Sequence, residues 1–87
     1  TIANAYSILN GEYEIIEAEI IETSELINKE LKNSDLPDEI RIGAILRGNE
    51  VIIPKSNFVF KKEDVVVFLA KKDFLKVVEN MFRISSI

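Results

Sequence analysis

The stretch over residues 40–54 constrains the fold most, because its pattern predicts a β-hairpin. Apolar residues alternate along residues 40–47, which places one set on each face of a strand: Ile40, Ile42, Ala44 and Leu46 against Arg41, Gly43, Ile45 and Arg47. Gly48 and Asn49 both tolerate positive φ and predict a two-residue turn. The return strand ends at Pro54, which cannot donate to a sheet ladder.

The rest of the chain supplies further strands and two helical segments. Residues 13–21 alternate, so we expect a strand that buries Ile16, Ala18 and Ile20. Thr23 or Ser24 can cap a short helix that ends before Pro37, with an apolar face of Leu26, Ile27 and Leu31. Residues 58–60 suit a short strand, and the apolar run over residues 65–70 suits a strand covered on both sides. Asp73 can cap a last helix, whose apolar stripe is Phe74, Leu75, Val78, Met81 and Phe82. This order predicts an α+β fold with a small, mostly antiparallel sheet and two flanking helices.

The length of the chain sets its domain organisation. Its 87 residues suit one compact domain, which we expect over residues 11–87, with residues 1–10 as a linker or the edge of the domain. Because the chain begins with threonine rather than methionine, we expect it to belong to a longer protein. Its longest apolar runs are strand-sized, whereas a membrane span needs about 20 apolar residues, so we expect no direct membrane insertion.

Residue types missing from the chain exclude several functions. There is no histidine or cysteine, which removes the commonest general base, the commonest metal ligand and any thiolate chemistry. The three glycines do not form a phosphate-binding motif. The formal net charge of −4 disfavours a nucleic-acid partner. We therefore expect no enzyme activity, no metal site and no nucleic-acid binding.

Three constellations are open to a functional interpretation. Arg47 could bind a phosphate and Asn49 a base or ribose, or both could be solvated residues at a turn. A set of carboxylates could hold a hard cation or form the wet face of a strand, and its spacing, which matches no calcium loop, favours the second: Glu12, Glu14, Glu17, Glu19, Glu22 and Glu25. An apolar set, Ile15, Ile21 and Ile45, is predicted to lie outside the core, where a homodimer or the chain's own helices would cover it.

The ordered set of motifs resembles a known family. Leu36-Pro37, residues 42–54 with their Ile-Gly-Ala-Ile-Leu-Arg-Gly core, Asp64 before an apolar strand, and the closing helix over residues 73–82 resemble the TrkA C-terminal domain family. This domain is also called the C-terminal lobe of the regulator of potassium conductance. The resemblance covers roughly residues 10–87 and is nearest to the final domain of TrkA-type potassium-uptake proteins.

The resemblance implies a fold, a role and partners. The fold is of the β-α-β-β-β-α type. The role is a regulatory one on the cytoplasmic side of a membrane potassium transporter, with a Rossmann lobe in the same chain and a homodimer through this domain. Some family members bind cyclic di-AMP or divalent cations between paired lobes, at positions that correspond here to Ile45, Arg47, Asn49, Ile53 and Pro54. No cofactor is implied beyond such a regulatory ligand. The chain departs from relatives at Asn28, where many carry glycine, and in having no histidine.

Two alternatives stay open beside this interpretation, namely a purely structural dimerisation module and the same domain on another ion transporter. If Arg47 is the donor to a ligand, Arg47→Ala should abolish binding and leave folding intact. If Ile42 faces the core, Ile42→Asp should unfold the domain, because an unpaired charge would be buried.

Overall fold

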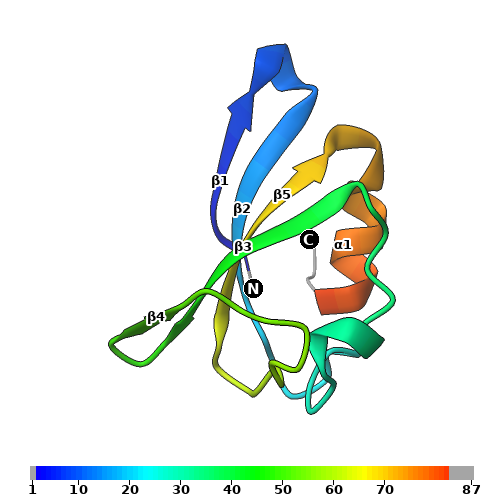
Figure 1. Ribbon diagram of the computed structural model, residues 1–87. Coiled ribbons are helices and arrows are strands. Elements are labelled where there is room, and N and C mark those ends of the chain that lie inside the picture. Colours follow the sequence, from blue (N-terminus) through cyan, green and yellow to red (C-terminus); the bar gives the residue numbers. More distant parts are fainter. Residues whose placement is uncertain (1, 83–87) are drawn as a thin grey trace.

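In the part of the chain that the structure describes, five antiparallel strands form one sheet, and a single α-helix lies on one side of it (Figure 1). The computed structural model describes residues 2–82. The sheet has the strand order β1-β2-β5-β3-β4. Its strands are β1 (Ile2–Ile8), β2 (Tyr13–Glu19), β3 (Ile40–Arg47), β4 (Glu50–Ile52) and β5 (Val65–Lys71). The helix is α1 (Leu75–Phe82), and 3-10 turns cover Leu9–Gly11, Leu31–Asn33 and Lys72–Phe74. The predicted α+β fold class is confirmed.

Residues 2–8, for which the sequence left linker and domain edge open, form the edge strand of the sheet. β1 pairs with β2 from Asn4 opposite Glu17 to Ile8 opposite Tyr13. The connection between the two strands turns through Leu9 and Asn10, both at positive φ, and Gly11 at φ 85°. Glycine adopts that conformation without strain, which suits it to this reversal.

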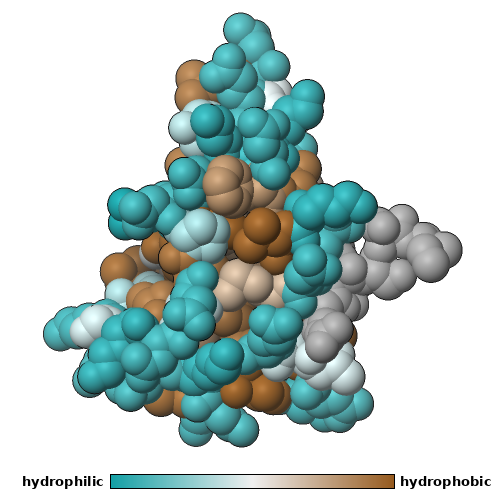
Figure 2. Space-filling model, turned by 90° about the vertical axis from the view of Figure 1, so that its right-hand side faces the viewer, coloured by the Kyte–Doolittle hydropathy of each residue, from teal (hydrophilic) through white to brown (hydrophobic). Residues whose placement is uncertain are grey.

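The core lies between the sheet and α1. On the sheet it consists of alternate residues of the central strands, among them Ile16, Ala18 and Phe68, as the period-two pattern predicted. From α1 come Val78, Met81 and Phe82, and the Phe82 ring stacks on Phe68 with centroids 5.0 Å apart. Viewed from the helix side, hydrophobic residues lie in the middle of the molecule between bands of hydrophilic ones (Figure 2). The predicted last helix and its apolar stripe are confirmed, but the prediction that Asp73 caps the helix is wrong, because Asp73 lies inside the 3-10 turn Lys72–Phe74 that precedes α1.

The helix predicted after Ser24 is wrong. Residues 21–30 form turns instead, and Asn28 has φ 64°, which no α-helix accommodates. The backbone of this segment pairs across to residues 58–60, through Asn28 N–H to Phe60 O at 2.8 Å and Leu31 N–H to Phe58 O at 2.8 Å. These long-range bonds replace the helical ones. In place of the short strand predicted there, residues 58–60 contribute an isolated bridge between Val59 and Glu30.

Ser24, which the sequence predicted to cap a helix, instead binds the backbone at the end of α1. Its hydroxyl is buried, donates to Met81 O at 2.8 Å, and accepts the Leu26 N–H at 3.2 Å. Glu25 N–H also donates to Met81 O, at 3.2 Å. The carbonyl of Met81 lies in the last turn of α1, where helical carbonyls have no partner within the helix. Ser24 therefore fastens the turn segment to the end of α1.

A register shift in β3 reverses the faces predicted for its second half. Ile40 and Ile42 pair with Ala70 and Phe68 of β5, but the pairing then skips Gly43, so that Ile45 lies opposite Val66. A bulge of this kind places two residues against one and switches the alternation. Ile45 is fully buried, and Ala44 and Leu46 lie on the other face. The predictions that Ile45 lies outside the core, and that Ala44 and Leu46 share the face of Ile42, are wrong.

Within residues 2–82, β5 is covered on one side only. Val66, Phe68 and Ala70 are buried, whereas Val65, Val67 and Leu69 on the opposite side are half-buried. The apolar run over residues 65–70 predicted a strand covered on both sides. In the structure, α1 covers one side of this strand. Ile21, also predicted outside the core, is half-buried after the end of β2.

Truncating Ile45 tests the bulge. Ile45→Ala should lower the free energy of unfolding by about 2–5 kcal/mol, because it removes fully buried methyl groups and leaves a cavity. Leu46→Ala should lower it by about 1 kcal/mol, since Leu46 is only half-buried. Urea denaturation of both variants measures the difference. A larger loss for Leu46→Ala would mean that the face assignment is reversed.

Candidate functional site

The predicted phosphate donor, Arg47, is bound within the protein. Arg47 Nε and Nη2 donate to the two carboxylate oxygens of Asp64, each at 2.8 Å, and Nη2 also donates to Val59 O at 3.0 Å. Asp64 is 1% exposed, and its Oδ2 accepts the Lys61 N–H at 2.9 Å. The fork of a guanidinium matches a carboxylate in this bidentate geometry. The pair therefore joins the end of β3 to the turn that precedes β5.

Two further contacts complete this arrangement, which we name the Arg47 cluster (Arg47, Phe58, Val59, Lys61 and Asp64). The Arg47 guanidinium lies 4.9 Å from the centre of the Phe58 ring, within cation–π distance. Hydrogen bonding to Asp64 raises the pKa of Arg47 above its ordinary value, against the opposing effect of desolvation. When the pKa of a cation is raised by folding, its contribution to stability is lost only as the pH rises through that pKa. Arg47 therefore stays charged, and its pair with Asp64 stays formed, at neutral pH.

The structure places the five predicted ligand residues in different environments. Ile45 is buried in the core and Arg47 is half-buried in its cluster. Asn49 is exposed in the hairpin turn, Ile53 is 73% exposed, and Pro54 is half-buried beside it. The surface at the base of the hairpin is thus formed by Ile53 and Pro54, while Ile45 offers no surface to it. A ligand at these positions stays a prediction.

The expectation that Arg47→Ala leaves folding intact does not fit this geometry. Removal of the guanidinium would leave the Asp64 carboxylate at 1% exposure without its charged partner. A buried charge that loses its partner is strongly destabilising. The side chain is therefore a structural tie in this arrangement, and a test of ligand binding must use its neighbours.

The acidic set lies along β2 and in the segments on either side of it. In residues 2–82 no group of three carboxylates comes close enough together to hold an ion. Glu17 accepts a hydrogen bond from Asn4 at 2.8 Å, and Glu22 pairs with Lys62 at 3.6 Å on the surface. Both contacts fit the interpretation of these carboxylates as a solvated face.

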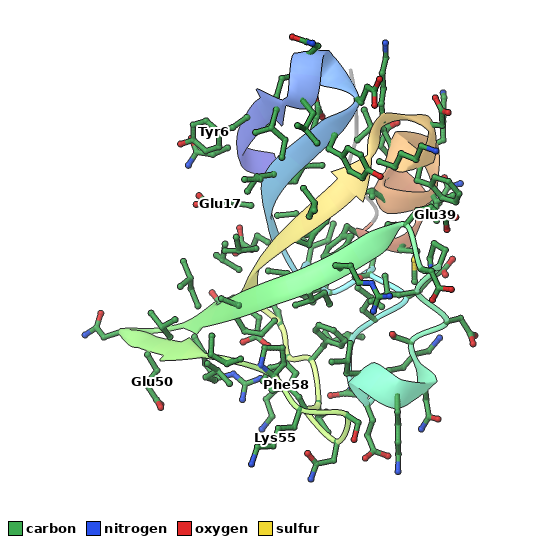
Figure 3. All side chains as sticks on the ribbon, turned by 45° about the horizontal axis from the view of Figure 1, so that its top comes forward. Tyr6, Glu17, Glu39, Glu50, Lys55 and Phe58 are labelled. Atoms are coloured by element: carbon green, nitrogen blue, oxygen red, sulfur yellow. The ribbon has the colours of Figure 1, made fainter. Side chains whose placement is uncertain are left out.

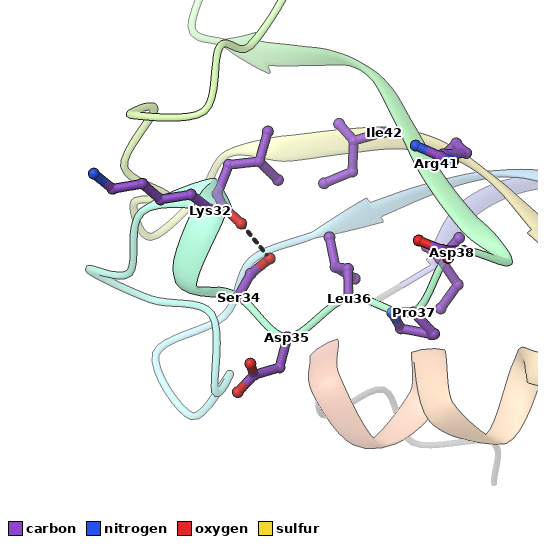
Figure 4. A pocket seen from close by; sticks show the side chains of 10 residues that line it. Lys32, Ser34, Asp35, Leu36, Pro37, Asp38, Arg41 and Ile42 are labelled. Carbon is purple, nitrogen blue, oxygen red and sulfur yellow. Dashed lines mark hydrogen bonds between the residues drawn. The ribbon is translucent and has the colours of Figure 1, made fainter.

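A groove of about 330 Å³ runs between the segment before β3 and β3 itself (Figure 4). One polar group of its wall is engaged within the chain, since the Ser34 hydroxyl donates to Leu31 O at 2.6 Å. The side chains of Lys32 and Asp35 point away from the groove (Figure 4). Asp38 and Arg41 also line the groove, so that it offers charged groups of both signs.

The side of the sheet opposite α1, which we name the outer face, is largely apolar. Tyr6 and Glu17 both point to this side, away from α1 (Figure 3). Tyr6 is 56%, Ile15 37% and Val51 69% exposed. The strand pairings assign these residues to it: Asn4, Tyr6, Ile8, Tyr13, Ile15, Glu17, Glu19, Arg41, Ala44, Leu46, Val51, Val65, Val67, Leu69 and Lys71. A hollow of about 370 Å³ lies at its centre, lined in part by Ile8, Ile15, Gly43, Val67 and Leu69.

Sequence reasoning found one of these exposed residues, Ile15, and missed Tyr6 and Val51. The period-two register of β2 would have indicated Tyr6 if residues 2–8 had been taken as its partner strand. The Arg47–Asp64 pair was also missed, because the partners are separated by 17 positions in sequence. The aspartate before the last strand was noted only as part of the resemblance.

The fold and these surfaces define a class of protein: a small α+β domain with a structural ion pair and, within residues 2–82, one sheet face that α1 does not cover. Comparison with known proteins gives the family. The model of the TrkA-C domain matches residues 15–83. The chain belongs to the TrkA-C domain family, as the resemblance predicted. No helix within residues 2–82 is long and apolar enough to cross a membrane.

The curated relatives of the chain are potassium-uptake proteins. It is 42% identical over 84 residues to the Trk system potassium uptake protein TrkA of Azorhizobium caulinodans, covering 97% of the chain and 18% of that protein. It is 36% identical over 86 residues to TrkA of Vibrio alginolyticus, covering 94% and 19%. It is 38% identical over 64 residues to a TrkA homolog of Archaeoglobus fulgidus, covering 74% and 15%. The chain thus spans about a fifth of the length of these relatives or less.

The Arg47–Asp64 pair can be tested by a double-mutant cycle. Arg47→Ala should lower the free energy of unfolding by about 3 kcal/mol, the lower end of the range for breaking a buried pair, since Arg47 is partly exposed. The double variant Arg47→Ala/Asp64→Ala should lose less than the sum of the two single losses. Lys62→Ala, which removes an exposed pair, is the control and should change little. Strictly additive losses would contradict the coupling.

Proposed function

We propose that this domain regulates a membrane potassium transporter from the cytoplasmic side, as part of a longer chain with a nucleotide-binding lobe. The observation that carries the proposal is its membership of the TrkA-C family over residues 15–83. The relatives are named as uptake-system proteins. The sequence also lacks histidine and cysteine, which agrees with a binding role rather than a catalytic one.

The mechanism we propose is a coupling between ligand binding and pairing of two copies. A ligand shifts an equilibrium between two arrangements only by the difference in its affinity for them. Pairing of two domains supplies such arrangements, and a ring of longer chains would pass the change to the transporter. The same domain as a structural dimerisation module would pair without any ligand response.

For the ligand we propose a nucleotide at the base of the β3–β4 hairpin, near Asn49, Ile53 and Pro54. Arg47 has donors to spare, because an arginine carries five N–H groups and the contacts to Asp64 and Val59 use those on Nε and Nη2. Its Nη1 group is the donor we assign to a phosphate. A divalent cation is disfavoured, because no three carboxylates in residues 2–82 come close enough together to hold one.

A domain exchange tests the regulatory role. We expect that this chain, in place of the matching segment of the Azorhizobium caulinodans relative, restores potassium uptake to cells that lack that relative. Rubidium influx measures uptake, and the same protein without the segment is the negative control. A folded, expressed chimaera with no more uptake than the truncated protein would contradict the proposal.

Thermal melts test the ligand site. Cyclic di-AMP or ATP should raise the melting temperature, because a ligand at tenfold excess over its Kd adds about 1.4 kcal/mol, which is several degrees for a domain of this size. Asn49→Ala and Ile53→Ala should reduce the increase without lowering the melt of the free domain, since both side chains are exposed. Calcium serves as the comparison ligand. Melts indifferent to all three ligands would favour the structural module.

A further inference from the structure

We infer that the free edge of β1 binds an extended, basic segment of the membrane transporter as an additional strand. The inference rests on the proposed function, from which it takes the partner, and it gives that partner a surface. β1 is an edge strand of the sheet, and its residues 4–7 are all exposed. It lies at the margin of the sheet, away from α1 (Figure 1). The backbone N–H and C=O groups on its outer edge are therefore open to a further strand.

The two edges of the sheet differ in their protection against such pairing. Short length, charged side chains and proline all discourage an edge strand from pairing. β4 has three residues, begins with Glu50 and is soon followed by Pro54. β1 has seven residues, and none of them is charged, proline or glycine. Its register shift lies near its start, so residues 4–8 pair regularly with β2 and offer a continuous template.

The strand next to β1 supplies negative charge to this edge. Six of the 15 acidic residues of the chain, and none of its 11 basic ones, lie in residues 1–28. Glu17 lies opposite Asn4 and accepts a hydrogen bond from its amide at 2.8 Å. Glu14 lies opposite Ser7, whose hydroxyl is 3.4 Å away. Both carboxylates thus reach towards β1, one on each face of the sheet.

These two carboxylates are not neutralised by bases in the part of the chain that the structure describes. On their β5 side they lie opposite Ala70 and Val67, which carry no charge. None of the three ion pairs among the described residues includes them. The bases Lys71 and Lys72 lie beside Glu12 instead. The charge of both carboxylates is therefore available to a partner.

The positions of the two acids define the sequence that would fit this edge. A strand added to β1 lies two strand spacings from β2, about 10 Å, which a lysine and a glutamate side chain can span together. Asn4 and Ser7 are three positions apart, so bases opposite them point to opposite faces. Between them, Tyr6 is 56% exposed and favours a β-branched residue across from it. The edge thus selects two bases three positions apart with β-branched residues between them.

A cytoplasmic segment of a membrane transporter has this chemistry. The cytoplasmic loops of membrane proteins carry an excess of lysine and arginine. A second copy of the chain fits this edge poorly, because pairing of β1 with β1 would bring the Glu14 and Glu17 carboxylates of both copies together. The net charge of −4 also disfavours an anionic lipid surface as the occupant.

An NMR titration of the isotopically labelled 87-residue chain tests the surface. The probe is the synthetic peptide Thr-Thr-Lys-Val-Val-Lys-Thr-Thr, which reads the same in both directions, and the control peptide carries glutamate in place of both lysines. The lysine peptide should slow solvent exchange of alternate β1 amides, because the outward N–H groups become hydrogen-bonded. The glutamate peptide should bind about tenfold more weakly, since two attractions become repulsions.

Charge removal from the protein gives a matched comparison. Glu14→Gln/Glu17→Gln should raise the dissociation constant of the lysine peptide about fivefold at low salt, because two exposed ion pairs are lost. Asp38→Asn/Glu39→Gln removes two exposed charges before β3 and should leave the dissociation constant unchanged. Asn4→Lys should also weaken binding, because it places a base on the edge itself.

Three results would overturn the inference. They are no binding at millimolar lysine peptide, equal binding of the glutamate peptide, and binding that leaves the exchange of the β1 amides unchanged.

Rubidium influx through the chimaera tests whether the transporter is the partner. Glu14→Gln/Glu17→Gln in the chimaera should reduce uptake, and Asp38→Asn/Glu39→Gln should not. Full uptake by the first double variant would overturn the transporter as the source of the segment. Peptide binding is measured on the free domain, so it can succeed where the chimaera restores no uptake, and the two proposals fail separately.

Discussion

A sheet has two faces, and the described part of this chain buries only one of them. Phe68 and Phe82 show how the helix side is filled, with the two rings stacked 5.0 Å apart. α1 is eight residues long and lies against the middle of the sheet. A domain of this size has little material for a second layer, because small chains bury a low fraction of their surface. The half-buried side chains of the outer face follow from that limit.

The Arg47–Asp64 pair helps to hold a segment for which the sequence predicted a helix and the structure shows turns. Residues 20–39 contain turns and one 3-10 turn, so they are held by long-range contacts. Asp64 is at the centre of these contacts, since its backbone carbonyl accepts the Ile20 N–H at 2.7 Å while its side chain binds Arg47. Residues 20–39, the β3–β4 hairpin and β5 are therefore all attached through Asp64. Removal of either charge should loosen all three.

Local patterns predicted what depends on local physics. Alternation identified β2, the hairpin and the residues that β2 buries, and apolar spacing identified α1. The same alternation runs unbroken through residues 40–47, so nothing in it marks the skip at Gly43, which is set by pairing with β5. The spacing of Leu26 and Leu31 favoured a helix, whereas the positive φ of Asn28 and its bond to Phe60 O depend on a segment some thirty positions later. The sequence pattern thus could not predict the side-chain faces and hydrogen-bond partners that are set by pairing with distant segments.

The bulge in β3 gives neighbouring residues opposite environments. Leu46 lies on the outer face and its neighbour Arg47 on the other, so one strand end contributes both to the outer face and to the Arg47 cluster. A ligand that engages Arg47 acts on the orientation of the hairpin, which also carries Val51. Pairing would in turn fix the hairpin in one orientation and change the affinity for the ligand by the same factor, as reciprocal coupling requires. The coupling passes through one short hairpin. Leu46→Ala should therefore change the effect of ligand on pairing more than it changes the pairing affinity without ligand or the ligand affinity of the single domain.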